Sequence, residues 1–151
     1  MDARDIQLQS GMQFNTIQDD ILYTVLSNSD LAKALTGIIK KGVRPSRKDF
    51  AKEEDCTIQS LPIPNGSVQF GTSNVNIYVS DKPDSITPPN ATNYDANTKR
   101  IKQLAGLAFK VLEKHYCDNG WSFECVMQDV IADPEIKCHR IWFKIRFIFH
   151  N

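Results

Sequence analysis

Nucleophilic or metal-binding chemistry in this chain would depend on its four cysteines and three histidines. His115 stands two residues before Cys117 at the end of a predicted helix, so these two side chains are expected to point to different faces. Cys138 and His139 are adjacent in a predicted strand, which also places them on opposite faces. No Cys-x-x-Cys pair occurs, and the ligand spacing of zinc sites is absent. We therefore predict no metal and no cofactor, and expect reduced, partly buried thiols. The cysteines are Cys56, Cys117, Cys125 and Cys138.

Catalytic motifs are also missing. The sequence has no phosphate-binding loop, no dinucleotide-binding fingerprint and no nucleophile elbow. One enzymatic arrangement stays open, a small hydrolase or transferase in which His115 acts as the base for Cys117 or Cys125. A histidine on the inner stripe of a helix beside ordinary thiols explains the same residues more simply. We predict that the protein is not an enzyme and assign no catalytic residue.

Charged residues cluster at two places in the first half of the chain. Three adjacent acids, Glu53, Glu54 and Asp55, precede a predicted strand and lack the spacing of a calcium loop, so we expect a solvated loop. The basic cluster could meet nucleic acid or an acidic protein surface, or it could be a solvated loop. Lys+Arg and Asp+Glu number 18 each, which is not the excess that phosphate-backbone binding requires. The basic cluster consists of Lys40, Lys41, Arg44, Arg47 and Lys48.

The last strand, over residues 138–149, has the clearest alternation in the sequence. One face is apolar throughout, and the other carries Trp142, Lys144, Arg146 and Ile148. Tryptophan and arginine are enriched at protein interfaces, so we interpret this second face as an interface. Scattered apolar exposure on a solvated strand is the alternative. The apolar face consists of Ile141, Phe143, Ile145, Phe147 and Phe149.

Helical and strand periodicity predicts the other elements. We expect a helix over 15–27 with Asn15 as its N-cap, and a short helical turn that ends at Gly37. A long helix is predicted over 95–117, closed by Asn119-Gly120. Strands are predicted at 38–40, 56–61, 67–79, 121–131 and 138–149. We expect a bulge at Gly71, and Phe123, Cys125 and Met127 on one face of their strand. A long loop is predicted at 81–93.

This order, helix, three strands, helix, two strands, predicts an α+β domain. Its sheet would be antiparallel or mixed, with about four to five strands and two main helices packed on one face. The length of 151 residues and the apolar fraction of 41% suit one globular domain, which we assign to 14–151, after a flexible arm at 1–13. No apolar signal region or membrane-spanning run is visible, so we expect assembly in a cytoplasm.

The segment from Arg44 to Asp81 resembles small tail-completion, or tail terminator, proteins of tailed phages and prophages. The features that carry the resemblance are a leading helix ending in Leu31–Gly37, then Arg44-Pro45, an acidic pair and the strand Asn74–Val79. A proline-rich loop, a long helix and two terminal strands follow in the same order, so the similarity in element order covers 15–150.

The resemblance implies a non-enzymatic structural protein located in the virion, at the head-proximal end of the tail. Such proteins form rings, commonly hexameric, that end growth of the tail tube and join the tail to the head connector. Another head–tail joining or minor tail protein is a close alternative. An accessory module that binds nucleic acid or an acidic protein through 40–48 is an alternative of a different class. The predicted interface residues are Lys40, Lys41, Arg44, Arg47, Lys48, Asn76, Tyr78, Pro83, Pro88, Pro89, Trp142, Lys144 and Arg146.

Overall fold

The computed structural model describes residues 2, 3, 6, 8, 10–46, 52–83, 94–117 and 120–151. A six-stranded sheet with the order β1-β2-β3-β8-β7-β6 dominates the fold. Its strands are β1 (Ile39–Lys41), β2 (Cys56–Ser60), β3 (Val68–Ser80), β6 (Lys114–Cys117), β7 (Trp121–Asp133) and β8 (Cys138–His150). β1 runs parallel to β2, and every other pair in this sheet is antiparallel.

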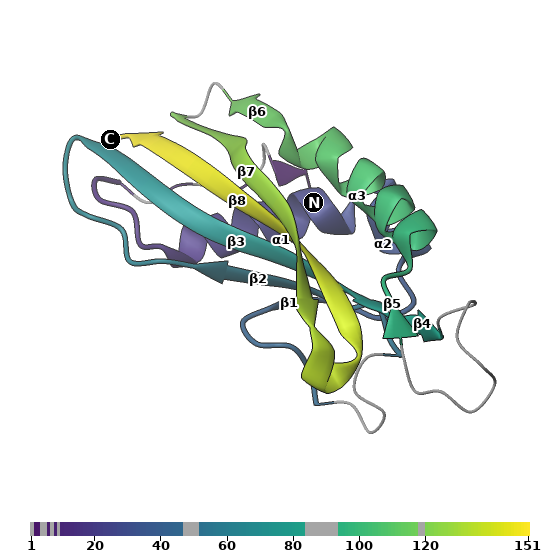
Figure 1. The fold of residues 1–151 in the computed structure, drawn as a ribbon. Coiled ribbons are helices and arrows are strands. Elements are labelled where there is room, and N and C mark those ends of the chain that lie inside the picture. Colours follow the sequence, from purple (N-terminus) through teal and green to yellow (C-terminus); the bar gives the residue numbers. More distant parts are fainter. Residues whose placement is uncertain are drawn as a thin grey trace.

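Helices cover one face of this sheet. They are α1 (Thr16–Ser27), α2 (Asp30–Ala34) and α3 (Thr98–Leu112), and in Figure 1 the strands pass in front of α1. A separate two-stranded ribbon pairs β4 (Lys82–Pro83) with β5 (Tyr94–Asp95), and a short 3-10 helix (Pro134–Ile136) turns β7 into β8. The predicted α+β domain with a mixed sheet and helices on one face is confirmed.

The strand count of the main sheet is six, above the four to five predicted, because the long helix ends earlier than expected. α3 stops at Leu112, and Lys114–Cys117 forms β6, paired with Trp121–Glu124 of β7. The sequence His-Tyr-Cys is a poor helix former and suits a strand beside aromatic partners. Gly120 therefore does not cap a helix. It lies in the turn between β6 and β7, where its φ of 87° is one that glycine adopts without strain.

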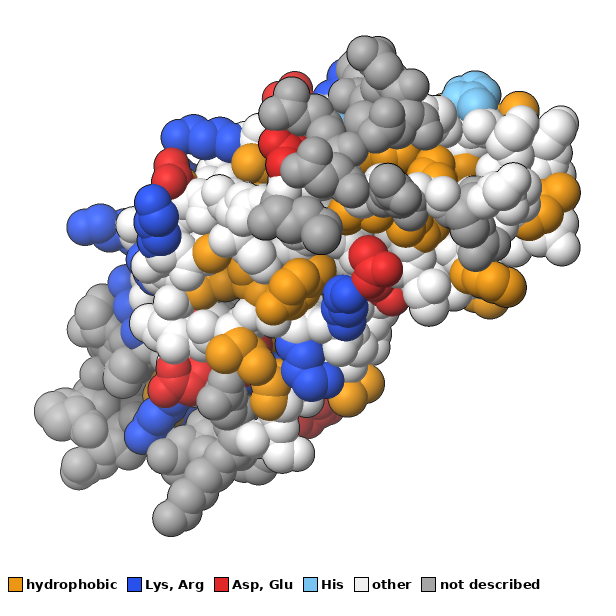
Figure 2. All heavy atoms as spheres, turned by 180° about the vertical axis from the view of Figure 1, so that it is seen from behind, with side chains coloured by type: hydrophobic (Ala, Val, Ile, Leu, Met, Phe, Trp, Pro, Cys, Tyr) orange, Lys and Arg blue, Asp and Glu red, His pale blue; other side chains and the backbone are white. Residues whose placement is uncertain are grey.

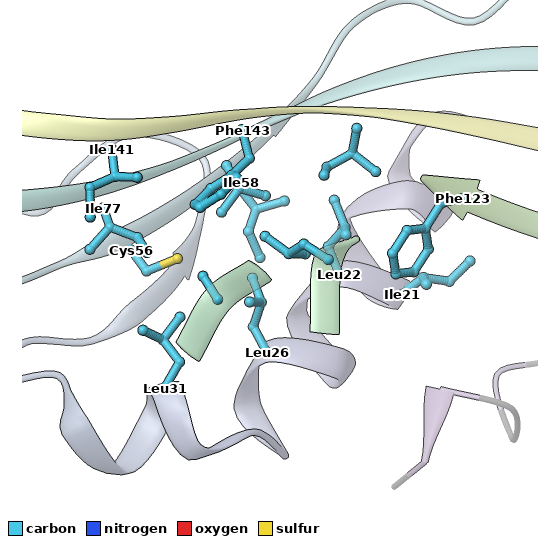
Figure 3. Close-up of a cluster of buried hydrophobic side chains, with 14 of the residues drawn as sticks. Ile21, Leu22, Leu26, Leu31, Cys56, Ile58, Ile77, Phe123, Ile141 and Phe143 are labelled. Atoms are coloured by element: carbon cyan, nitrogen blue, oxygen red, sulfur yellow. The ribbon is translucent and has the colours of Figure 1, made fainter. Parts of the chain in front are cut away.

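The hydrophobic core lies between the helices and one side of the sheet (Figure 3). Ile21, Leu22 and Leu26 from α1 and Leu31 from α2 face side chains of β2, β3, β7 and β8, and all four are fully buried. The apolar face predicted for the last strand is confirmed, since all five of its side chains are at most 2% exposed. Burial of that face against the helices is the main apolar contribution to this core.

The β-bulge predicted at Gly71 is wrong. The register of β3 with β8 runs without interruption from Val68 to Ser80, and the irregularity lies in β7 between Cys125 and Met127. Gly71 has a packing role, because a Cβ there would lie 2.5 Å from Gln18 Oε1. The extra residue in β7 turns Met127 to the face of Lys144, so Met127 does not share a face with Phe123 and Cys125 as predicted.

Two predicted helix ends also differ from the structure. Asn15 stands at the start of α1, but its side chain donates to Leu61 O, 3.1 Å away, and makes no cap hydrogen bond. Gly37 lies beyond the end of α2, with no room for a Cβ beside Glu54 and Asp55. In the arm at 1–13, Ala3 is buried and Gln13 N donates to Gln69 Oε1 at 2.8 Å. The flexibility of that arm stays a prediction.

Candidate interface on the open face of the sheet

The face of the sheet opposite the helices, which we call the open face, carries the even-numbered residues of β8 from Arg140 to His150. Trp142 lies beside Asn76, Lys144 beside Asn74 and Met127, and Arg146 beside Thr72 and Glu124. The alternation of a strand puts these side chains opposite the buried apolar set. The predicted interface residues Asn76, Tyr78, Trp142, Lys144 and Arg146 are thus brought together on one face, from two neighbouring strands.

One half of the open face is polar and hydrogen-bonded. Trp142 Nε1 donates to Asn74 Oδ1 at 2.9 Å, and Arg140 donates to Asn76 Oδ1 at 3.2 Å. Arg140 Nε also meets Asp133 Oδ2 at 3.2 Å. These bonds hold the indole and the guanidinium in fixed positions while both side chains stay partly exposed. A fixed, partly exposed tryptophan beside an arginine is the kind of group that anchors a protein contact.

The open face carries a groove. This groove, of about 270 Å³, is lined by Gln59 of β2 and Ile131 of β7 together with residues of the two strands between them. Sheets twist in general, and the bulge in β7 increases the local twist beside this groove. Figure 1 shows the β7–β8 hairpin twisting away from the rest of the sheet. The remaining lining residues are Asn74, Asn76, Arg140 and Trp142.

The other half of the open face is more apolar. Phe70 pairs with Ile148 and is 57% exposed, and Val68 beside His150 is also exposed. Arg146 forms an exposed ion pair with Glu124 at 2.6 Å. An exposed aromatic ring beside other apolar side chains is more typical of a contact surface than of a solvated strand.

The three residues of the basic cluster that the structure describes, Lys40, Lys41 and Arg44, have partners within the protein. Lys40 Nζ donates to Val43 O at 2.9 Å, and Lys41 pairs with Asp20 and lies 5.3 Å from the centre of the Tyr23 ring. Both lysines remain accessible to solvent. Figure 2, which views the molecule from behind, shows basic, acidic and apolar side chains interspersed among the described residues.

Arg44 has a structural position. Its side chain is 12% exposed, its Nε lies 3.1 Å from Oδ2 of the fully buried Asp55, and it donates to Glu53 O at 2.8 Å. The guanidinium also stacks 4.5 Å from the centre of the Tyr78 ring. A buried carboxylate needs such a partner, so Arg44 is required by the fold before it is available to any other protein.

The acidic cluster is not the solvated loop that we predicted, because Glu54 and Asp55 are buried. Arg100 of α3 holds Glu54 with two bonds of 2.7 Å, and Glu54 N donates to Thr36 Oγ1 at 2.9 Å. The bidentate pair fixes α3 to the segment before β2. These carboxylates are therefore used in ion pairs, and the described residues contain no group of three or more His, Cys, Asp or Glu placed to hold a metal.

The thiols that the structure describes are poor nucleophiles. Burial raises the pKa of Cys56 to about 12 and that of Cys138 to about 11, so both are protonated at neutral pH. Burial also raises the pKa of Cys125. His115 stacks between Trp121 and Phe123, with ring centres 5.1 and 5.2 Å away. The imidazole thus packs with aromatic rings on the side of the sheet that the helices cover.

Other predicted positions are at the margins or outside the described residues. Pro83 belongs to β4, where it pairs with Tyr94. Arg47, Lys48, Pro88 and Pro89 lie outside the described residues. Several residues of the open face were not predicted from the sequence. Arg140 could have been predicted, because it lies on the same side of the last strand as Trp142. The residues that were missed are Arg140, Asn74, Phe70, Met127 and Ile131.

Comparison with known proteins gives no assignment. No protein-family model matches the sequence, and no curated protein matches it. In the part of the chain that the structure describes, no helix has the length and apolarity needed to cross a membrane.

Proposed function

We propose that this protein is a non-enzymatic virion assembly protein of the tail terminator type. In this proposal it forms a ring at the head-proximal end of a phage tail, ends growth of the tail tube and offers a surface to the head connector. The family comes from the sequence resemblance described above. The observation that supports a role in assembly is the open face, where Trp142, Arg140 and Phe70 stay uncovered on one side of a twisted sheet.

The composition of the open face suits a protein partner. Arg140, Lys144 and Arg146 follow one another along β8, while Glu124 and Asp129 lie beside them on β7. Mixed charge around an aromatic anchor is the arrangement of a specific protein interface. A nucleic acid would need a surface with an excess of cations, and three of the predicted basic residues, Lys40, Lys41 and Arg44, already have partners inside the chain.

The test is tube capping. Purified protein is added to growing tail tubes of the phage or prophage that encodes the chain, and tube length and tube-end density are measured by electron microscopy. We expect a ring at one end and shorter tubes. Trp142→Ala and Lys144→Glu should weaken capping, whereas Lys99→Glu, an exposed change on α3, should not. Tubes of unchanged length without an end ring would reject the proposal.

The same preparations distinguish the alternative class. Binding to duplex DNA is measured at low and physiological salt for the unchanged protein and for Lys40→Glu. Strong binding that falls steeply with salt and is lost in the variant would favour a nucleic-acid module. Absence of such binding, together with capped tubes, is the expected result.

A further inference from the structure

The strand β7 is much longer than its outer neighbour. β6 pairs only with Trp121–Glu124, whereas β7 continues to Asp133 and is paired along that length with β8. Among the described residues, the segment 126–133, which we call the free β7 edge, thus has a strand on one side only. An edge of this kind presents unpaired backbone groups to any strand that approaches.

The free β7 edge is also apolar. Val126, Met127 and Val130 are all at least 40% exposed. Proteins that avoid edge pairing place lysine or proline at such positions, and 126–133 contains neither. A local protection is Asp129, whose Oδ1 accepts the Val130 amide at 2.7 Å. That bond places the Val130 amide on the free side of β7, where a strand would meet it.

The opposite edge of the same sheet is β1. Ile38 O accepts from Cys56 N at 2.8 Å, and Gly42 N donates to Ile58 O at 2.8 Å, so these backbone groups face β2. Alternation in a parallel pair then directs the amides and carbonyls of Ile39 and Lys41 away from the sheet. Both ends of the sheet thus carry backbone groups for a further strand.

The two edges match in direction and in register. In a second copy with the same orientation, β1 runs antiparallel to β7, given the strand directions within the sheet. Opposing residues of an antiparallel pair share a face. Lys40 lies beside Thr57, and Asp129 beside Trp142, so both are on the open face.

Placing Lys40 opposite Asp129 sets the neighbouring pairs. Ile39 then falls opposite Val130 on the helix side of the sheet, with the outward backbone groups of both residues facing each other. Ile38, which is 48% exposed, falls opposite Ile131. A single register therefore joins one pair of opposite charges and two apolar pairs, which are the combinations that stabilise neighbouring strands.

We propose that a second copy of this chain adds its β1 edge, Ile38–Lys41, to the free β7 edge, with Lys40 opposite Asp129. In the joined state Asp129 turns from the Val130 amide to Lys40, and that amide bonds to Ile39 of the neighbour. The contact uses two different surfaces of one protein, so repetition builds a closed ring when the rotation closes. This inference rests on the proposed function, because it supplies the contact from which the ring would be made.

Charge exchange tests the contact. The mass of the unchanged protein, Lys40→Glu, Asp129→Lys and the double variant is measured by light scattering across concentration. We expect a discrete oligomer for the unchanged protein and an increase of about tenfold or more in the concentration needed for assembly for each single variant, because each places like charges together. The double variant should regain assembly. Glu135→Lys, an exposed change at the tip of the same hairpin, is the matched control and should behave as the unchanged protein.

The outcomes separate this contact from the proposed function. Circular dichroism first verifies that every variant is folded. A monomeric unchanged protein at all concentrations, single variants with unchanged mass, or a double variant that stays monomeric would each overturn the strand pairing. If the variants assemble normally and tubes are still capped, the contact is wrong and the function stands. If the charge exchange behaves as expected but tubes are not capped, the contact stands and the function is wrong.

Discussion

The two faces of β8 differ more than any other neighbouring surfaces of the molecule. From Arg140 to His150, the odd-numbered residues are apolar and buried beneath the helices, whereas the even-numbered residues are at least partly exposed. The backbone and its hydrogen bonds are common to both faces, so the difference arises from what covers each one. The helix side therefore determines whether the chain folds, and the open face determines what the folded chain can contact.

Adjacent aromatic residues of β8 provide the sharpest test of this difference. Phe143→Ala removes a fully buried ring and should lower the free energy of unfolding by about 3–5 kcal/mol. Trp142→Ala removes a partly exposed ring with one hydrogen bond and should cost about 1 kcal/mol or less. Urea unfolding of both variants measures the contrast. Equal losses at the two positions would mean that the open face is part of the core.

Ion pairs offer a second contrast between buried and exposed positions. Arg44→Ala leaves the buried Asp55 carboxylate without its guanidinium and should cost about 3 kcal/mol. Arg146→Ala removes a pair in which both side chains are at least 40% exposed, and should cost about 0–1 kcal/mol. Thermal unfolding under matched conditions compares the two. A small loss of stability in Arg44→Ala would mean that the fold does not need Arg44, and the residue would again be a candidate for the interface.

Local sequence patterns predicted the apolar contacts of the core well and the long-range polar contacts poorly. The alternation of Ile141, Phe143 and Ile145 is read along one strand and needs no partner, so the sequence alone indicated the burial of that face. The pair of Arg100 with Glu54 joins residues 46 positions apart, and no local pattern marks it. The local pattern near residue 54 therefore predicts a solvated loop, although Glu54 and Asp55 are buried.

The groove could not be predicted from the sequence either, because it is formed by residues that are distant along the chain. Its lining joins Gln59 of β2 and Ile131 of β7, which are 72 positions apart, and the bulge near Cys125 has no glycine or proline to mark it. The free β7 edge likewise depends on where β6 ends, and the sequence had placed β6 inside a helix. Pairing of strands and the ends of short strands depend on distant residues, so they become visible only in three dimensions.

The side of the sheet that the helices cover also contains a carboxyl group whose contribution to folding stability should be small and dependent on pH. Asp19 of α1 accepts from Ser60 Oγ at 2.6 Å, and burial is the main reason that its pKa is raised above 3.8. A carboxyl with a raised pKa holds its proton more tightly in the folded state, so its contribution to stability is greatest in acid and is lost as pH rises through the folded pKa. Asp19→Asn keeps an oxygen for Ser60 and removes the titration. Urea unfolding should therefore show a weaker fall of stability with rising pH just above 3.8 than in the unchanged protein. If Asp19→Asn does not change how the free energy of unfolding depends on pH, the Asp19 carboxyl is solvated. The helix side would then be less fully buried at α1 than the contrast between the two faces implies.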